Sequence, residues 1–127
     1  MSIAGQQRAT IEAPQERQWE PTQLLSKVDN DIDLATELVE LFLEDAPEMS
    51  YDISMAARAG SAQRLASAAH AYKGSASAIG AAAVAKAAGA LEAAGRAGSA
   101  DVELEMVHFK ELEGRLIAEL VAATTDA

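Results

Sequence analysis

Apolar side chains recur at three- and four-residue spacing along most of the chain, which is the period of one face of an α-helix. No segment alternates with the period of a strand, so the pattern predicts an all-α protein with four main helices. Glu113 falls within the last apolar stripe, and the pattern offers no reason for a charge there. The predicted core positions are Ile32, Ala35, Val39, Phe42, Ala46 and Met49; Leu65, Ala69, Tyr72, Ala76 and Ile79; Val84, Ala88 and Leu91; and Val102, Met106, Phe109, Leu112, Leu116 and Leu120.

Local signals place the ends of these helices. Acidic and amide residues at 29–31 favour a helix start, and Pro47 should kink or interrupt the helix that follows. Residues 60–61, Gly-Ser, form a stop and an N-cap, Gly80 ends the next helix, and residues 95–99 form a turn. Turns this short make consecutive helices antiparallel neighbours, so we expect an up-down-up-down four-helix bundle.

The beginning of the chain has a different character. Residues 1–20 show little periodicity and predict a flexible N-terminal tail. Pro21 starts a short amphipathic helix that holds Leu24 and Val28. The chain of 127 residues is long enough for one domain with a real core, and we expect the bundle domain to cover 21–127.

Composition and charge exclude several classes. The chain has no cysteine, so it has neither disulfides nor a cysteine-based metal site. No signal peptide or membrane-length apolar run is visible, which predicts a soluble cytoplasmic protein without a membrane partner. The net charge of −10 argues against a nucleic-acid partner. Residues 61–100 are the exception, with four basic side chains and one acidic side chain. This segment predicts attraction of an acidic partner, and the alternative is a chance clustering of basic residues.

His70 is the most informative residue of that basic segment. If Leu65 is the centre of the buried face, His70 lies about 140° away and Lys73 roughly 60° from His70. His70 should therefore face solvent. Its polar neighbours on the exposed face are Gln63, Ser67, Gly74 and Ser77. A glycine inside a helix costs about 1 kcal/mol relative to alanine. Gly74 is thus best explained by close approach of another protein to the imidazole. The alternative for His70 is an ordinary surface histidine on an amphipathic helix, which would be equally exposed.

The run from Ala69 to Ala81 closely resembles the phosphohistidine motif of histidine-containing phosphotransfer (HPt) domains of bacterial multistep phosphorelays. The matching residues are Ala69, His70, Lys73, Gly74, Ser75, Gly80 and Ala81. Weaker similarities are the segments 41–45 and 47–48 and the pair 91–92. Ala76 and Tyr72 depart from the residues that are frequent in the family, without disturbing His70. The resemblance implies a four-helix bundle with the histidine exposed midway along one helix.

The resemblance also implies roles for the exposed residues. His70 would be the phosphoacceptor. An unperturbed imidazole has a pKa of about 6.5, so much of it is neutral and nucleophilic at pH 7. Lys73 would offset charge on the phosphoryl group, and Gly74 with Gln63, Ser67 and Ser77 would bind the partner. The partners would be receiver domains of response regulators and a hybrid sensor histidine kinase. The group would come from an aspartyl phosphate and pass to another receiver, with Mg²⁺ on the receiver and no cofactor on this chain.

Three alternatives come from other classes. The first is a phosphotransfer module of a larger, chemotaxis-like histidine kinase; since no nucleotide-binding motif is present, this chain should not be an ATP-dependent kinase on its own. The second is a metal-binding bundle, suggested by one Glu-x-x-His match at Glu105 and His108. The third is a non-catalytic helical adaptor, which would acquire no acid-labile phosphate from a phosphorylated receiver.

Overall fold

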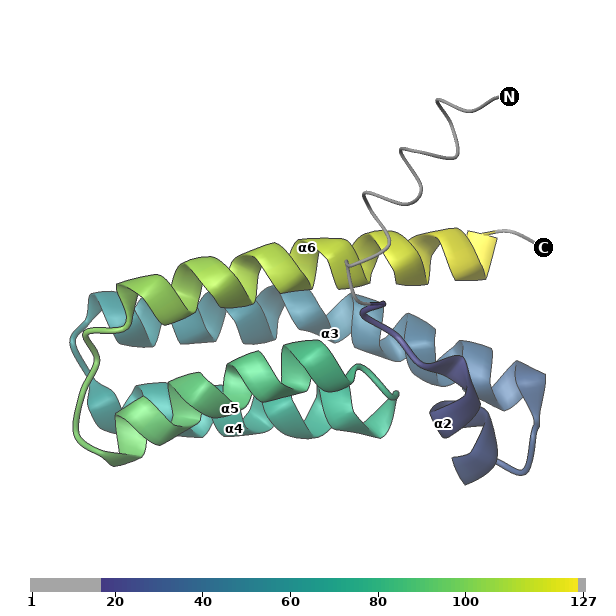
Figure 1. Ribbon diagram of the computed structural model, residues 1–127, viewed down its shortest axis with the longest axis horizontal. Coiled ribbons are helices and arrows are strands. Elements are labelled where there is room, and N and C mark those ends of the chain that lie inside the picture. The colour runs from purple at the N-terminus through teal and green to yellow at the C-terminus, as the bar shows by residue number, and fades with distance from the viewer. Residues whose placement is uncertain (1–16, 126–127) are drawn as a thin grey trace, which may run out of the picture.

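The computed structural model describes residues 17–125, and this part of the chain contains five helices and no strand. Successive long helices run in opposite directions and pack side by side, and the short first helix lies beside the start of α3 (Figure 1). The all-α bundle is therefore confirmed. The helices are α2 (Pro21–Lys27), α3 (Ile32–Arg58), α4 (Ala62–Ala78), α5 (Ala82–Arg96) and α6 (Glu103–Thr125).

Helix α3 begins as the sequence predicts but is not interrupted. The Asp31 side chain accepts a hydrogen bond from the Leu34 backbone nitrogen at 3.1 Å and caps the helix. The helix then runs through Pro47 to Arg58, so the expected interruption at Pro47 is wrong. Pro47 is exposed, and on the solvent side of a helix water can bind the carbonyl that a proline leaves without a donor.

The predicted apolar stripes form the core, with one clear exception. Ile32 is 68% exposed, because it occupies the first turn of α3 at the end of the bundle. Met49, Met106 and Leu112 are partly buried and pack against the core. The other stripe positions are buried. No helix within residues 17–125 is long and apolar enough to cross a membrane.

Helices α4 and α5 approach each other closely because α5 is built from small residues. A Cβ added at Gly95 would lie 2.6 Å from the Ala62 carbonyl oxygen and 2.7 Å from the Ala66 nitrogen. Such distances are shorter than van der Waals contact, so a side chain at position 95 would force the helices apart. The close packing brings the C-terminal half of α5 beside the N-terminal half of α4.

The end of the predicted N-terminal tail is packed against the bundle. The Trp19 indole nitrogen donates to the Ile79 carbonyl oxygen at 2.7 Å, and the Glu20 nitrogen donates to the Gly80 oxygen at 3.1 Å. Gly80 has a φ of +87°, and a Cβ there would meet the Glu20 oxygen at 2.7 Å. Gln18 is also buried. The expected tail thus ends before residue 20 in the structure, while residues 1–16 lie outside the described part.

Glu113, which the pattern left unexplained, holds a polar cluster inside the bundle. The Ser50 hydroxyl donates to its Oε1 at 2.9 Å, and the Tyr72 hydroxyl donates to its Oε2 at 2.7 Å. The ring of Tyr72 packs edge-on between Phe42 and Phe109, with centroid separations of 5.8 and 4.8 Å. Tyr72 is fully buried, so its hydroxyl lies inside the core. Glu113 thereby links α3, α4 and α6.

Candidate functional site

Helix α4 presents His70 to solvent, as the helical pattern predicts. The positions Leu65, Ala69, Tyr72 and Ala76 on its opposite side are all 0% exposed. The side chain of His70 is 62% exposed. The predicted rotation of this helix is therefore confirmed, and the imidazole is accessible to another molecule.

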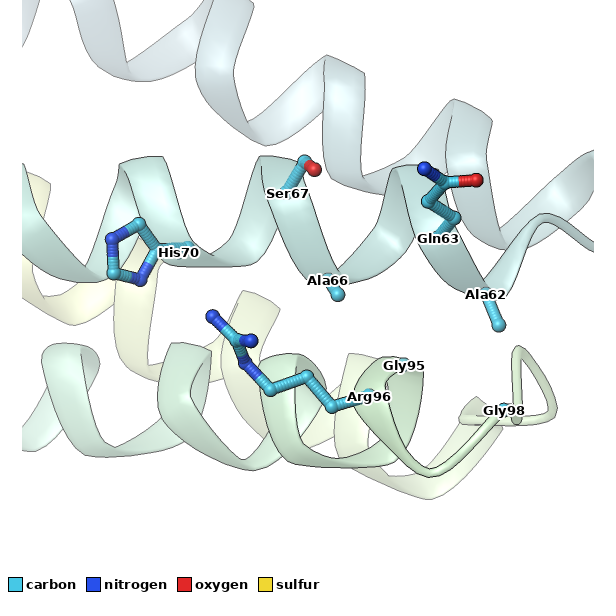
Figure 2. A pocket seen from close by; sticks show the side chains of 8 residues that line it. All are labelled: Ala62, Gln63, Ala66, Ser67, His70, Gly95, Arg96 and Gly98. Carbon is cyan, nitrogen blue, oxygen red and sulfur yellow. The ribbon is translucent and has the colours of Figure 1, made fainter.

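The other predicted site residues occupy two sides of His70. Gln63 and Ser67 lie N-terminal to it and line a surface groove that also includes the imidazole and Arg96 (Figure 2). Gly74 lies one turn C-terminal, where an added Cβ would meet nothing within 4 Å. Ser77 is exposed farther along, and its carbonyl oxygen accepts a hydrogen bond from Lys27 at 3.1 Å. Gly74 and Ser77 do not line the groove.

Glu92 on α5 is the centre of the site. Its Oε2 lies 2.9 Å from His70 Nδ1, and its Oε1 lies 2.7 Å from Lys73 Nζ. Arg96, one turn farther along α5, donates to Oε2 from Nε at 2.9 Å and from Nη2 at 2.6 Å. Glu92 is only 5% exposed. One buried carboxylate thus joins the three basic side chains of the site.

Local features of α5 position this carboxylate. Glu92 follows Leu91, a core residue, and lies close to the point where Gly95 allows α5 to contact the backbone of α4. Gly89 leaves room for the stem of Lys73, whose Cδ lies 3.4 Å from where a Cβ at position 89 would be. The turn expected at 95–99 starts later, because α5 continues to Arg96. This extra length keeps Arg96 at helical spacing from Glu92.

The surrounding cations keep Glu92 ionised. The pKa of its carboxyl group is lowered from the usual value near 4.5 to about 2, chiefly by the hydrogen bond from Lys73 and then by that from Arg96. Burial opposes this shift, and the His70 hydrogen bond adds to it. Glu92 is therefore a carboxylate at any pH in which a cell operates.

This charge state fixes the proton on the imidazole. A carboxylate can only accept hydrogen bonds, so the contact with Glu92 requires a proton on Nδ1 of His70. In the neutral imidazole the other nitrogen, Nε2, then carries the lone pair. The site can thus present Nε2 as a nucleophile, on an exposed ring whose orientation is held by the hydrogen bond to Glu92.

Sequence reasoning missed the roles of Glu92 and Arg96. The position of Glu92 carried a signal, because it is the one acidic residue in segment 61–100 and directly follows a core leucine. Its contact with His70 could not be predicted, since the two residues are 22 positions apart and meet only through helix packing. Arg96 is one of the four basic residues of that segment, and nothing else in the sequence marks it.

The structure does not assemble a metal site from the Glu-x-x-His match. Glu105 and His108 are both exposed on α6. Within residues 17–125, no three His, Asp or Glu side chains come together in a way that could hold a metal ion.

Comparison with known proteins gave one family. A family model described as the Hpt domain matches residues 37–126, which is most of the chain and includes His70, Lys73 and Glu92. Neither the curated proteins nor the solved structures gave a match.

Proposed function

The chain belongs to the Hpt domain family, and on that premise we propose that His70 is its phosphoacceptor. A histidine phosphotransfer module of this kind would accept the group from an aspartyl phosphate of a receiver domain and pass it to the receiver of a response regulator. A hybrid sensor histidine kinase would be the upstream partner, and the exchange would take place in the cytoplasm. The observation that carries this proposal is the exposed imidazole whose Nδ1 is held by Glu92 at 2.9 Å.

The proposed transfer requires no proton to move. The lone pair of Nε2 forms a bond to phosphorus, while the bond from phosphorus to the aspartate oxygen breaks and its electron pair stays on the aspartate. Because Nδ1 keeps its proton, the product ring is a phosphoimidazolium cation. The Glu92 carboxylate would stabilise that charge, as the aspartate of a Ser-His-Asp catalytic triad stabilises an imidazolium. Onward transfer reverses these steps, with a second aspartate as nucleophile and a neutral imidazole as leaving group.

Lys73 supports the same chemistry from the side. It lies one turn from His70, and its side chain is 39% exposed. Its ammonium group would compensate negative charge on the transferred phosphoryl group. Catalysis of phosphoryl transfer depends mainly on such positioning and charge stabilisation. Mg²⁺ would be supplied by the receiver, and we expect this chain to bind no cofactor.

The surface around His70 supports docking of a protein. Gly74 places no side chain beside the imidazole, and open space surrounds it. We infer that the receiver approaches over Gly74 and that Gln63, Ser67 and Ser77, which are exposed on α4, contribute contacts. A phosphotransfer module of a larger kinase would use the same residues, so the partner must be identified by experiment.

The first experiment tests the acceptor. Wild-type protein mixed with a radiolabelled phosphorylated receiver should acquire acid-labile phosphate, and His70→Gln should acquire none while remaining folded. His108→Gln is the matched control, since His108 is the only other histidine and is also exposed. Label on His70→Gln would contradict the assignment. Absence of label on the wild type with every receiver tested would favour the adaptor.

The second experiment tests the docking direction. Gly74→Leu should slow transfer from the receiver by about tenfold or more, as expected when a side chain obstructs an interface. Phosphoramidate needs no protein docking, so it should label the variant at a near-normal rate. Gly114→Leu is the matched control, because Gly114 is also an exposed helical glycine with nothing within 4 Å of an added Cβ. If Gly74→Leu takes label from the receiver as fast as Gly114→Leu, the receiver does not approach over Gly74.

A further inference from the structure

We propose that Arg96 is the cation that binds the phosphoryl group once His70 is phosphorylated, by moving its guanidinium from Glu92 to the phosphoryl oxygens. This inference rests on the proposed function, because it concerns the state of His70 that the proposed function creates. It assigns a role to a residue outside the sequence motif. Four observations support it: the crowding at Glu92, the position of Arg96, its exposure and the charge change at the site.

The two oxygens of Glu92 are unequally occupied. Oε1 has one partner, the ammonium group of Lys73 at 2.7 Å. Oε2 accepts three, one from His70 and two from Arg96. A carboxylate oxygen offers about two acceptor sites, so the hydrogen bonds at Oε2 compete with one another. Arg96 can leave Oε2 while the His70 bond remains, whereas Lys73 would leave Oε1 without a donor.

The position of Arg96 suits contact with a group on the imidazole. Its side chain is 65% exposed, compared with 39% for Lys73. It extends along the groove toward the His70 ring (Figure 2). Nδ1 of His70 and Nη2 of Arg96 share one acceptor atom, so they are no farther apart than the sum of those two hydrogen-bond lengths. The phosphoryl group is carried by Nε2 of the same ring, so the guanidinium must extend past Nδ1 to reach it. Nη1 has no hydrogen-bond partner within residues 17–125 and is available to a new acceptor.

The charge at the site changes in the direction that would recruit Arg96. A phosphoryl group brings roughly −1.5 to −2 charges and strong acceptor oxygens. The imidazole becomes a cation in the same step, so Glu92 keeps two positive partners, the ring and Lys73. Arg96 is then the surplus cation at Glu92. A guanidinium can bind two phosphoryl oxygens at once, which a lysine ammonium cannot match in geometry.

The inference is tested on the phosphorylated full chain. Phosphoramidate transfers its phosphoryl group to Nε2, its P–N bond breaks, and the departing nitrogen takes a proton from water to leave as ammonia. The pKa of the phosphoryl group on His70 is then measured by ³¹P NMR. A bound cation lowers the pKa of an acidic group, so Arg96→Gln should raise this value by about one unit or more relative to wild type. Arg96→Lys should restore part of the difference.

A matched control exists on α6. Arg115 pairs with Glu111 at 3.1 Å with the same i,i+4 spacing that separates Arg96 from Glu92, and it does not line the groove beside His70. Arg115→Gln should leave the phosphoryl pKa unchanged. If Arg96→Gln titrates like wild type, or if only Lys73→Gln raises the value, the inference is wrong although His70 is still phosphorylated. If phosphoramidate labels no histidine in the wild type, the proposed function fails, and the inference fails with it.

Discussion

Two buried glutamates hold α4 from different sides, and their surroundings differ. Glu92 is 5% exposed and contacts His70, while Glu113 is 7% exposed and contacts Tyr72, two positions farther along the same helix. The partners of Glu92 are basic side chains that reach solvent. The partners of Glu113 are hydroxyl groups, and that of Tyr72 lies inside the core. Equal burial of the same residue type therefore has different consequences.

The two clusters differ in whether the donors to the glutamate can leave it for another acceptor. At Glu92 the donors are cations on flexible, half-exposed side chains, so a new anion beside His70 can draw one of them away. At Glu113 the donor from α4 is a ring fixed between two phenylalanines. Burial, together with the nearby Glu113 carboxylate, raises the pKa of Tyr72 well above its usual value, so this hydroxyl remains a donor. We infer that Glu113 fixes the rotation of α4 and that Glu92 prepares the imidazole.

The largest expected effect is on stability, through Glu113. Replacing Glu113 with Ala leaves the Tyr72 and Ser50 hydroxyls without their acceptor, and a buried unsatisfied donor costs about 1–3 kcal/mol. Glu113→Ala should therefore lower the free energy of unfolding by roughly 2–5 kcal/mol, measured by urea denaturation. Tyr72→Phe, which leaves the Ser50 bond intact, should cost less. The folded fraction of Glu113→Ala should still take label from phosphoramidate.

Glu92→Gln is the natural comparison in the same urea titration. Its partners can be hydrated when the carboxylate is lost, because all three are exposed or half-exposed. We therefore expect its unfolding midpoint to lie much closer to wild type than that of Glu113→Ala. Equal destabilisation by the two substitutions would show that Glu92 is also mainly a structural residue, and the distinction between the clusters would be lost.

Most of the fold could be predicted from the sequence, because it depends on local periodicity. The rotation of α4 followed from the spacing of Leu65, Ala69 and Tyr72, and the exposure of His70 followed from that rotation. Errors occurred where the outcome depends on how far a residue lies from the packed core, which the local pattern does not show. Pro47 remains within α3 since its face is exposed, and Ile32 is exposed because the bundle ends there.

The candidate site could be predicted only in part, for a related reason. His70, Lys73 and Gly74 are adjacent in the chain, so their common surface can be read from helical geometry. Glu92 and Arg96 reach them from another helix, at a distance set by Gly95. Glu113 and Tyr72 likewise come from different helices, which is why an acidic residue in an apolar stripe had no local explanation. Side chains that meet across helices require the packed structure.

The second expected effect is on transfer, through Glu92. Glu92→Gln replaces the carboxylate with an amide that cannot stabilise the phosphoimidazolium cation as strongly. Labelling of His70 by phosphoramidate should slow by about 10- to 100-fold, the range expected when one charge-assisted hydrogen bond to the transition state is weakened. Imidazole ¹⁵N NMR spectra should show a larger share of the tautomer protonated at Nε2. A labelling rate equal to wild type would mean that Glu92 holds its neighbours without assisting the chemistry.

The smallest expected effect is the pH dependence of stability contributed by Glu92. Its pKa in the folded protein is about 2, below the usual value near 4.5, so the folded state favours the ionised form. This contribution is fully present above the unfolded value and is lost as the pH falls toward the folded value. Urea midpoints measured at several pH values between 5 and 2 should therefore fall more for wild type than for Glu92→Gln. The other carboxylates titrate in both proteins, so the difference between the two curves isolates Glu92. Parallel curves over this range would show that Lys73 and Arg96 do not lower the pKa of Glu92 in the folded protein.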